Sequence, residues 1–269
     1  MSRRTCMTRT NPSSTTASPA VSSPDIPVPG RLCAIHQPNL FPRLTTLAKL
    51  FAADTWIVLD DVQFTRRDYQ HRARLAALGD PQASRWMSIP THLPQGRQTL
   101  IRDALIVDPD LALRRTASML QQYYGASLHW PALAQVLEPM AAAFGSNRTA
   151  AVAESSTRTL LDLLGWKGQI LRSSDFRARP GRSQRLADLT TAVGACSYLC
   201  GTGGMKYLDV APFMTQGIAV TPFLTPPAGV WASGHRITVM WALATLGPTA
   251  VAGRLQAVAA AQTALATTA

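Results

Sequence analysis

Residues 31–64 read RLCAIHQPNL FPRLTTLAKL FAADTWIVLD DVQF, and this stretch decides the fold that we expect. An apolar run at 32–35 predicts a buried strand, the spacing at 44–53 predicts an amphipathic helix, and the run at 56–59 predicts a second strand. Strands that alternate with helices are typical of α/β proteins. The stretch therefore predicts a Rossmann-like α/β fold, in which a mainly parallel sheet is flanked by helices.

Polar side chains follow both of these strands. His36 ends the first strand, and Asp60 with Asp61 ends the second. Ligands of open parallel sheets bind outside the carboxyl ends of the strands, so we expect the active-site edge here. Neighbouring residues of a strand point to opposite faces, which means that one aspartate faces the cleft and the other caps or pairs. We favour Asp61 for the cleft, and the pattern leaves the choice open.

The composition indicates a globular protein with an excess of cations. The 269 residues are 46% apolar, which is enough for a sizeable core, and the net charge of +11 comes from 26 Lys and Arg against 15 acids. Most of this excess is arginine, which favours an anionic partner such as a nucleotide, a nucleotide-linked substrate or RNA. An arginine-rich proteome encoded by GC-rich DNA explains the surplus equally well, so the charge alone decides nothing.

The cysteines and the apolar runs predict a cytoplasmic protein without a membrane segment. The cysteines form no CxxC pair and no metal-like pattern with histidine, which favours structural thiols over disulfides; they are Cys6, Cys33, Cys196 and Cys200. No apolar run approaches the roughly 20 residues that span a bilayer. The first residues, MSRRTCMTRT, lack the apolar core of a secretory signal.

The chain divides into three predicted segments. Residues 1–30 are rich in Ser, Thr and Pro and predict a disordered tail, because they have few apolar side chains to bury. Residues 31–254 predict a single α/β domain with a helical section at about 109–165. Residues 255–269 predict an Ala-rich helix or tail.

Further strands and helices follow from the same patterns. Strands at 169–172 and 197–200 are predicted to lie beside the first two strands, mainly parallel and in one sheet. The arginine-dense residues 65–74 predict a loop or the start of a helix, followed by short strands at 86–89 and 101–107. A Pro/Gly loop that resembles a mobile cover separates these two strands, and helices are predicted at 109–124, 183–193, 237–246 and 251–265.

Two motifs suggest chemistry. His36 can act as a general base or acid, with Asn39 beside it, although packing under the proline turn is the alternative. The segment GTGGMKYLD at 201–209 contains three glycines that let backbone N–H groups approach a ligand, and Lys206 can meet a phosphate or carboxylate there. A simple tight turn explains the glycines as well.

Several common site motifs are missing from the sequence. It contains no GxSxG elbow, no Walker lysine motif and no GxGxxG fingerprint. The remaining histidines show no zinc-ligand spacing, so we expect no structural metal; they are His71, His92, His129 and His235.

Five segments, taken together, resemble the WbqC-like protein family. They are AIHQPNLFPRL, WIVLDDVQFTRRDYQHRAR, WMSIP, SSD and SYLCGTGGMKYLD, and they occur in the family's order from residue 32 to about 248. The resemblance implies a cytoplasmic bacterial protein of polysaccharide or specialised-metabolite biosynthesis, and a transferase that moves glycine or another aminoacyl group to an amino sugar. The family's motif positions correspond to His36, Pro38, Asn39, Asp60, Asp61, Gln63, Arg72, Ser174, Gly201, Gly204, Tyr207 and Leu208.

The chain also departs from the family's pattern. Arg43 stands where a tryptophan is usual, His71 where an asparagine is usual, and Trp241 where an aspartate is frequent. The segment TPPAGVWASG at 225–234 replaces a family segment that contains His-Pro. These changes imply that the acceptor differs from an O-antigen sugar.

The leading hypothesis is an amide-forming acyl or aminoacyl transferase that acts on a small-molecule amine. His36 would deprotonate the amine, Asp61 would orient His36 or the ammonium, and Asn39 completes the catalytic set. The donor is left open between ATP and aminoacyl-tRNA, no cofactor is assigned, and the oligomeric state is undetermined. The expected substrate-binding residues are Asp60, Gln63, Tyr69, Arg72, Ser174, Gly201, Gly203, Gly204, Lys206 and Tyr207.

Two other hypotheses remain beside the leading one. An ATP-dependent amide ligase of the nucleotidylyltransferase-like type would use the same residues, and an RNA-binding or scaffold protein would use none of them for chemistry. All the enzyme hypotheses share one geometric expectation. The 36–39 turn, Asp61 and the 201–206 loop should surround a single pocket, with the segment around Arg72 as one wall and the pKa of His36 near neutral.

Overall fold

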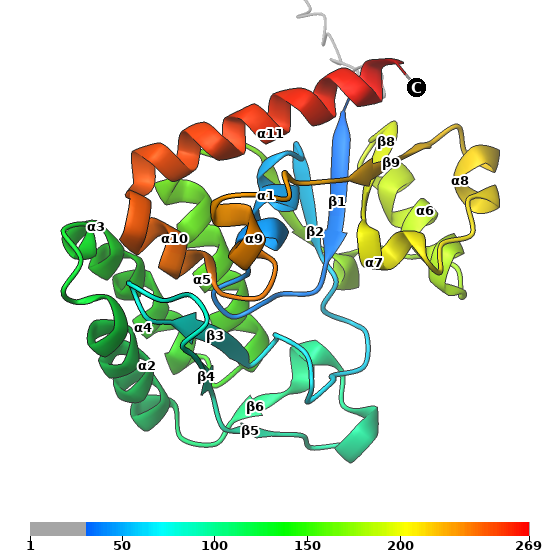
Figure 1. Ribbon diagram of the computed structural model, residues 1–269. Coiled ribbons are helices and arrows are strands. Elements are labelled where there is room, and N and C mark those ends of the chain that lie inside the picture. The colour runs from blue at the N-terminus through cyan, green and yellow to red at the C-terminus, as the bar shows by residue number, and fades with distance from the viewer. Residues whose placement is uncertain (1–30, 269) are drawn as a thin grey trace, which may run out of the picture.

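The computed structural model describes residues 31–268, so the tail predicted at 1–30 lies outside the described residues. Its centre is a five-stranded sheet in which every pairing is parallel (Figure 1). The strand order is β7-β2-β1-β8-β9. The bounds are β1 (Leu32–His36), β2 (Thr55–Val58), β7 (Gln169–Arg172), β8 (Ser197–Gly201) and β9 (Ala219–Phe223). The four predicted parallel strands are therefore confirmed as neighbours in one α/β sheet.

The direction of winding reverses at β1. The chain adds β2 and then β7 on one side of β1, and it crosses to the other side to add β8 and β9. A crevice forms at such a switch point, because the connections leave the two central strands in opposite directions. Here the crevice lies between the carboxyl ends of β1 and β8.

The pairing of β1 with β8 is short, which widens this crevice. β1 pairs with β2 along four residues and ends with His36 opposite Val58. On the other side, Leu32 pairs with Ser197 and Cys33 with Tyr198, and the register ends there. The carbonyl of Ile35 is therefore left for another donor.

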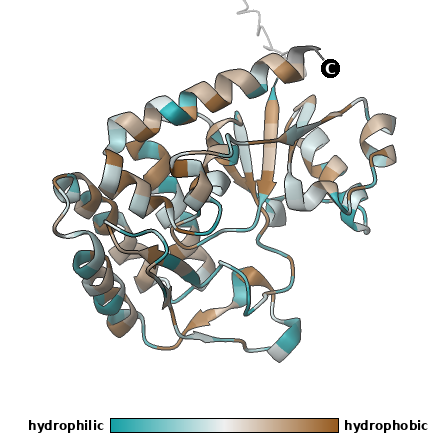
Figure 2. Ribbon diagram, viewed as in Figure 1, coloured by the Kyte–Doolittle hydropathy of each residue, from teal (hydrophilic) through white to brown (hydrophobic). Residues whose placement is uncertain are grey.

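Side chains of β1 alternate between two cores, as the period of two along a strand requires. Leu32 and Ala34 belong to the larger hydrophobic cluster, whereas Cys33 and Ile35 belong to the smaller one. In Figure 2 the sheet strands carry mostly apolar colours. Helices that supply the larger core include α1 (Leu44–Phe51), α5 (Thr149–Leu163), α9 (Val230–Gly234), α10 (Val239–Leu246) and α11 (Pro248–Thr268), and the smaller core is supplied by α6 (Arg182–Ala192) and α8 (Ala211–Thr215).

The helical section predicted at about 109–165 is present. Asp108 caps its first helix, because its side chain accepts a hydrogen bond of 2.9 Å from the Leu111 N–H. Its elements are α2 (Pro109–Tyr124), α3 (Trp130–Ala134), η3 (Gln135–Leu137), α4 (Glu138–Gly145) and α5.

Two small antiparallel sheets occupy the segment that follows β2. β3 (Arg72–Ala76) pairs with β4 (Ser84–Ser88), and β5 (Thr91–His92) pairs with β6 (Leu105–Ile106). The loop or helix predicted at 65–74 is thus wrong from Arg72 onward, because this stretch alternates half-buried and buried residues as a strand. The strand predicted at 101–107 is a 3-10 turn, η2 (Ile101–Asp103), followed by β6, and a second turn, η1 (Gly96–Gln98), precedes it.

Helix α11 runs without a break across residue 254, where the sequence suggested a boundary. Leu255 is fully buried and Val258 is 7% exposed, and both belong to the larger core. The carboxy-terminal helix is therefore packed on the α/β domain. None of the helices within residues 31–268 has the length and apolar character that crossing a bilayer requires.

Candidate active site

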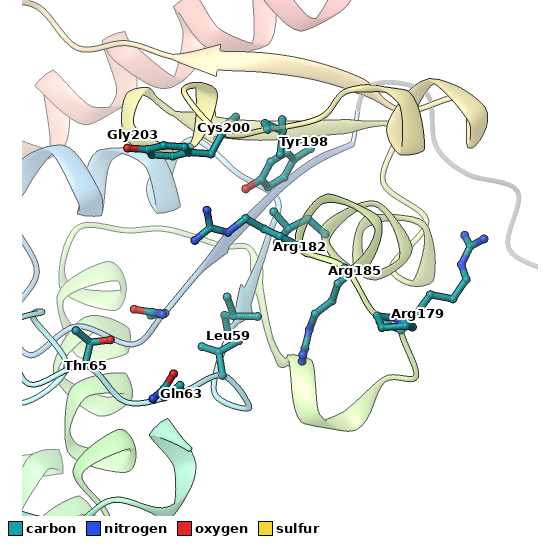
Figure 3. A pocket seen from close by; sticks show the side chains of 18 residues that line it. Leu59, Gln63, Thr65, Arg179, Arg182, Arg185, Tyr198, Cys200 and Gly203 are labelled. Atoms are coloured by element: carbon teal, nitrogen blue, oxygen red, sulfur yellow. The ribbon is translucent and has the colours of Figure 1, made fainter. Parts of the chain in front are cut away.

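Two adjoining cavities lie outside the carboxyl ends of the sheet strands. The inner cavity, of about 690 Å³, lies between the turn after β1, the helix α1 and the short helix α7 (Thr202–Met205). The outer cavity, of about 890 Å³, lies between the turn after β2, the start of α6 and α7 (Figure 3). Six residues line both cavities: Gln37, Leu59, Leu186, Tyr198, Gly203 and Gly204. The pair is one cleft with two compartments.

His36 lines the inner cavity as a neutral ring. Its Nδ1–H donates to the Gln37 carbonyl oxygen at 2.7 Å, which leaves Nε2 as an acceptor. Burial, followed by the nearby charges of Lys49 and Arg43, lowers the pKa of His36 to about 3. The expectation of a near-neutral pKa is therefore wrong, because the burial of the ring, which is the larger cause, is a property of the assembled fold.

Lys49 is the residue that the sequence reasoning missed. It lies on α1, is 6% exposed and lines the inner cavity. Its Nζ donates to the Ile35 carbonyl oxygen at 3.2 Å, the oxygen that the short β1–β8 pairing leaves free. None of the ion pairs within residues 31–268 includes Lys49.

The surroundings of Lys49 favour loss of its proton. Burial lowers the pKa of Lys49 to about 8, and the Cys200 and Cys33 thiols oppose this shift only in part. The same burial raises the pKa of Cys33 to about 12, so that thiol stays protonated. A signal for Lys49 existed in the sequence: Thr45, Thr46 and Lys49 are the polar residues of the predicted helix, Lys49 stands three or four residues from each threonine on one face, and all three line the inner cavity.

Asn39 brings an unused amide to the inner cavity. Its side chain is 3% exposed, and its Nδ2 has no hydrogen-bond partner among the described residues. The Asn39 carbonyl oxygen accepts from the Thr157 hydroxyl of α5 at 3.0 Å, which fixes the turn. His36 and Asn39 thus lie in one cavity, as the sequence predicted.

Asp60 supports the strand ends. It is 5% exposed and accepts hydrogen bonds from the Ser173 hydroxyl at 3.1 Å, the Ser174 N–H at 3.1 Å and the Ser174 hydroxyl at 2.9 Å. Both serines belong to η4 (Ser173–Asp175), directly after β7. Neither Asp60 nor Ser174 is among the residues that line the two cavities. The two residues tie β2 to β7, which is a different role from the predicted contact with substrate.

Asp61 holds an arginine instead of His36. Its carboxylate contacts the Arg185 guanidinium of α6 and accepts from the Ser173 hydroxyl. The predicted bond from Asp61 to His36 is absent among the hydrogen bonds of residues 31–268, and the Nδ1 of His36 is taken by Gln37. Asp61 therefore positions a wall of the outer cavity, because Arg185 lines that cavity.

The segment around Arg72 contributes Thr65 to the outer cavity and Asp68 to the inner cavity, and a second arginine segment also lines the outer cavity. Arg72 lies 4.2 Å over the Trp86 ring and donates to the Asp68 carbonyl oxygen, and neither it nor Tyr69 is among the lining residues. The arginines that do line the outer cavity come from the start of α6 and were missed; they are Arg179, Arg182 and Arg185. An arginine count along the sequence cannot tell the two segments apart.

The glycine segment lies at the junction of the two cavities. Gly201 lines the inner cavity, and Gly203 with Gly204 lines both. A Cβ on Gly204 would lie 2.8 Å from the Cys200 sulfur, so only glycine fits there. The predicted proximity of this segment to the 36–39 turn is confirmed. Lys206 is exposed and is not among the lining residues, although Tyr207 lines the outer cavity.

Other polar residues of the cleft have modest roles. Gln63 lines the outer cavity, and its amide donates to the Arg97 carbonyl oxygen. Gln37, which the sequence analysis did not single out, lines both cavities and accepts from the buried Gln70 amide at 2.8 Å. Of the departures from the family pattern, Arg43 lines the inner cavity. Trp241 is 8% exposed in the core and donates to the Ala77 carbonyl oxygen at 3.1 Å.

Comparisons with known proteins identify the family of the chain. The model of the WbqC-like protein family matches residues 37–229, which is more than half of the chain, and the chain therefore belongs to this family. A protein of Mycobacterium tuberculosis (strain ATCC 25618 / H37Rv), named Uncharacterized protein Rv1507c, is 26% identical over 190 residues. That similarity covers 71% of this chain and 80% of the relative. No solved structure matches the chain.

Proposed function

We propose that this member of the WbqC-like protein family is an amide-forming transferase, which moves an acyl or aminoacyl group from an activated donor to an amine acceptor. The observation that carries the proposal is Lys49. This buried lysine lies at the switch point of the sheet, lines the inner cavity, and makes no ion pair within the described chain. Burying a charged group costs free energy, so it persists only where another interaction compensates. Groups whose pKa values are shifted by burial concentrate at active sites.

The pKa values favour Lys49 over His36 as the base. An amine acceptor is protonated near neutral pH and must lose a proton before it can attack a carbonyl carbon. A general base works best when its pKa is near the operating pH. The pKa of Lys49, lowered to about 8, meets this condition, whereas the pKa of His36, lowered to about 3, makes its ring too weak a base.

The proposed step begins with the acceptor ammonium in the cleft. It gives a proton to the neutral Nζ of Lys49, and the nitrogen lone pair attacks the donor's carbonyl carbon, so that a C–N bond forms. The tetrahedral intermediate then collapses, and the C–O bond to the donor's carrier breaks. Of the two protons that the nitrogen loses, Lys49 returns one to the departing oxygen and the other is released to water.

Two neighbours of Lys49 suit the rest of this step. The free Nε2 of His36 can accept a hydrogen bond from the acceptor amine and orient its lone pair. The Asn39 Nδ2, which has no partner within the described residues, can donate to the carbonyl oxygen as negative charge develops on it. Both side chains line the same cavity as Lys49.

A row of rings and guanidinium groups beside the inner cavity favours a donor carried on RNA. Arg43, which lines the cavity, lies 4.4 Å from the centre of the Tyr69 ring. The centres of the Tyr69 and Trp86 rings lie 5.5 Å apart. Trp86 is 38% exposed, and the Arg72 guanidinium lies 4.2 Å from the centre of its ring. Proteins hold single-stranded RNA by stacking bases on aromatic rings and pairing phosphates with arginine. We therefore favour an aminoacyl-tRNA over a donor made from ATP.

The test measures products with and without each donor. Purified protein is incubated with candidate amines and either aminoacyl-tRNA or an amino acid with ATP, and mass spectrometry scores new amides and AMP. The proposal expects an amide that requires aminoacyl-tRNA, that is lost in Lys49→Met, and that persists in Lys167→Met, which removes an exposed lysine away from both cavities.

The other outcomes separate the alternatives. An amide that forms together with AMP from ATP identifies the ligase instead of the transferase. Full activity of the Lys49→Met variant would show that Lys49 is not the base on which the proposal depends. RNA binding without any amide product from any donor supports the non-catalytic RNA-binding hypothesis.

A further inference from the structure

The outer cavity contains a cation that the protein itself does not neutralise. Of its three arginines, Arg179 pairs with Asp188 at 2.6 Å, and Arg185 pairs with Asp61. Arg182 takes part in none of the ion pairs within residues 31–268. In Figure 3 the Arg182 side chain extends into the space below Tyr198, whereas the Arg179 guanidinium is turned away.

The backbone around Arg182 adds to this positive site. Arg182 is the first residue of α6, an 11-residue helix that follows Gly181, whose φ is 99°. Gly181 has no side chain to cap this helix start, and the helix dipole places partial positive charge on the first N–H groups. The Nε of Arg185, one turn later, is buried without a partner among the described residues. The unpaired guanidinium of Arg182 and the start of α6 therefore contribute positive charge to one wall.

The other walls suit a small organic molecule. Leu59, Leu186 and Tyr198 provide apolar surface, and Tyr207, which is 70% exposed, offers a ring next to Arg182 at 5.9 Å. The volume of about 890 Å³ falls within the range of roughly 300–1,000 Å³ for small-molecule sites. The cavity is thus large enough for a phosphate together with the group that carries it.

We infer that the outer cavity binds a phosphate-bearing small molecule, with its phosphate on the guanidinium of Arg182 and the start of α6. Arginine provides a planar fork that matches two phosphate oxygens, and the bonds are strengthened by charge. Asp61 holds Arg185, which lines the same cavity. A nucleotide-linked amine and a simple phosphorylated amine share this chemistry.

The position of the site indicates which reactant it serves. The outer and inner cavities share Gln37 and Gly203, so a molecule anchored at Arg182 can extend toward Lys49. The row of Arg43, Tyr69 and Trp86 reaches the inner cavity through Arg43, whereas the outer cavity is bounded by α6. The phosphate-bearing ligand is then the amine acceptor. This identification rests on the proposed function, whereas the binding of phosphate at Arg182 does not.

The experiment measures binding without turnover. Isothermal titration calorimetry of the full chain uses four probes: a nucleoside diphosphate, inorganic diphosphate, a hexosamine phosphate and the unphosphorylated nucleoside. We expect the phosphorylated probes to bind and the nucleoside to bind at least about tenfold more weakly. Tight binding of the nucleoside diphosphate alone identifies a nucleotide-linked ligand, and tighter binding of the hexosamine phosphate identifies the simple phosphate.

Three variants make the assignment specific. Arg182→Ala should weaken the phosphorylated probes about tenfold or more, and Arg182→Lys should keep part of the affinity because the charge remains. Arg177→Ala, which removes an exposed arginine outside the outer cavity, should bind as the unmodified protein does. Lys49→Met should also bind normally, so failure of the proposed chemistry and failure of this site can be told apart. Equal binding by the Arg182→Ala and Arg177→Ala variants overturns the inference, provided that thermal unfolding shows both to be folded.

Discussion

Lys49 in the inner cavity and Arg182 in the outer cavity are both cations that form no ion pair within the described chain, but water reaches them differently. Lys49 is 6% exposed and burial lowers its pKa to about 8, whereas Arg182 is exposed. Arginine keeps its proton at any physiological pH, and a buried lysine can lose it. One cleft therefore contains Lys49, which is suited to moving a proton, and Arg182, which is suited to binding an anion.

The largest effect should come from changing Lys49 to a cation that cannot lose its proton. If Lys49 acts as a base, Lys49→Arg should lower kcat by about 10²–10⁴-fold, as much as Lys49→Met does. If Lys49 acts only as a positive charge, Lys49→Arg should keep most of the activity, and the distinction between the two cavities would disappear. Steady-state kinetics with the amine product measured by mass spectrometry decides between these outcomes.

The two neighbouring aspartates should differ in how much they contribute to stability. Asp60 is 5% exposed with its oxygens bonded to Ser173 and Ser174, so Asp60→Ala should lower the free energy of unfolding by about 2–3 kcal/mol. Asp61→Ala should cost less, about 1 kcal/mol or below, because its partner Arg185 is 27% exposed.

Binding should change in the opposite order for these two variants. Asp61→Ala removes a negative charge beside the outer cavity and frees Arg185, so it should strengthen phosphate binding there, while Asp60→Ala should leave the affinity of the folded protein unchanged. Urea unfolding and calorimetry on both proteins provide the two readouts. Equal stability losses would show that Asp60 does not tie the strand ends as its contacts indicate.

The smallest effect concerns stability at acidic pH. The pKa of His36 is lowered from 6.5 in the unfolded chain to about 3, so between these values the unfolded state binds a proton that the folded state does not. Stability contributed by the neutral ring is therefore present above pH 6.5 and is lost as the pH falls toward 3. His36→Gln should reduce the loss between pH 6.5 and pH 4 by about 1–3 kcal/mol, as measured by urea unfolding.

The outer cavity supplies the control for this measurement. Arg182→Ala removes neither a histidine nor a carboxyl group, so it should leave the slope of stability against pH unchanged. Part of the slope should persist in His36→Gln, because burial also lowers the pKa of His71 to about 4. An unchanged slope in His36→Gln would mean that the ring is protonated in the folded protein well above pH 3.

Local patterns predicted most of the sheet. The strands β1, β2, β7 and β8 are short apolar runs between turn residues, and such runs bury themselves wherever the chain places them. The strand β9 was not predicted, because Pro222 interrupts its apolar pattern. A proline is tolerated there because β9 lies at the edge of the sheet, and that position is a property of the topology.

Aspartate and arginine roles were harder to predict, because they depend on partners distant in sequence. Asp61 pairs with Arg185, and Asp60 accepts a hydrogen bond from Ser173, and both partners lie more than 100 residues further along the chain. Arg72 and Arg182 look alike in the sequence, but Arg72 stacks on Trp86 in a small sheet while Arg182 enters the outer cavity. Side-chain charge alone does not specify which of several arginines faces a ligand.

The sequence by itself determined the α/β fold, the parallel strands and the meeting of His36 with the glycine segment, because hydrophobic periodicity and the rule for strand ends act on local patterns. Only the tertiary structure decided that Lys49 is buried. That burial depends on where the register between β1 and β8 ends, which leaves the Ile35 carbonyl oxygen for the lysine. Desolvation of a charge is a property of the assembled surroundings, so the inner cavity acquired its chemistry from the packing and not from its sequence motif.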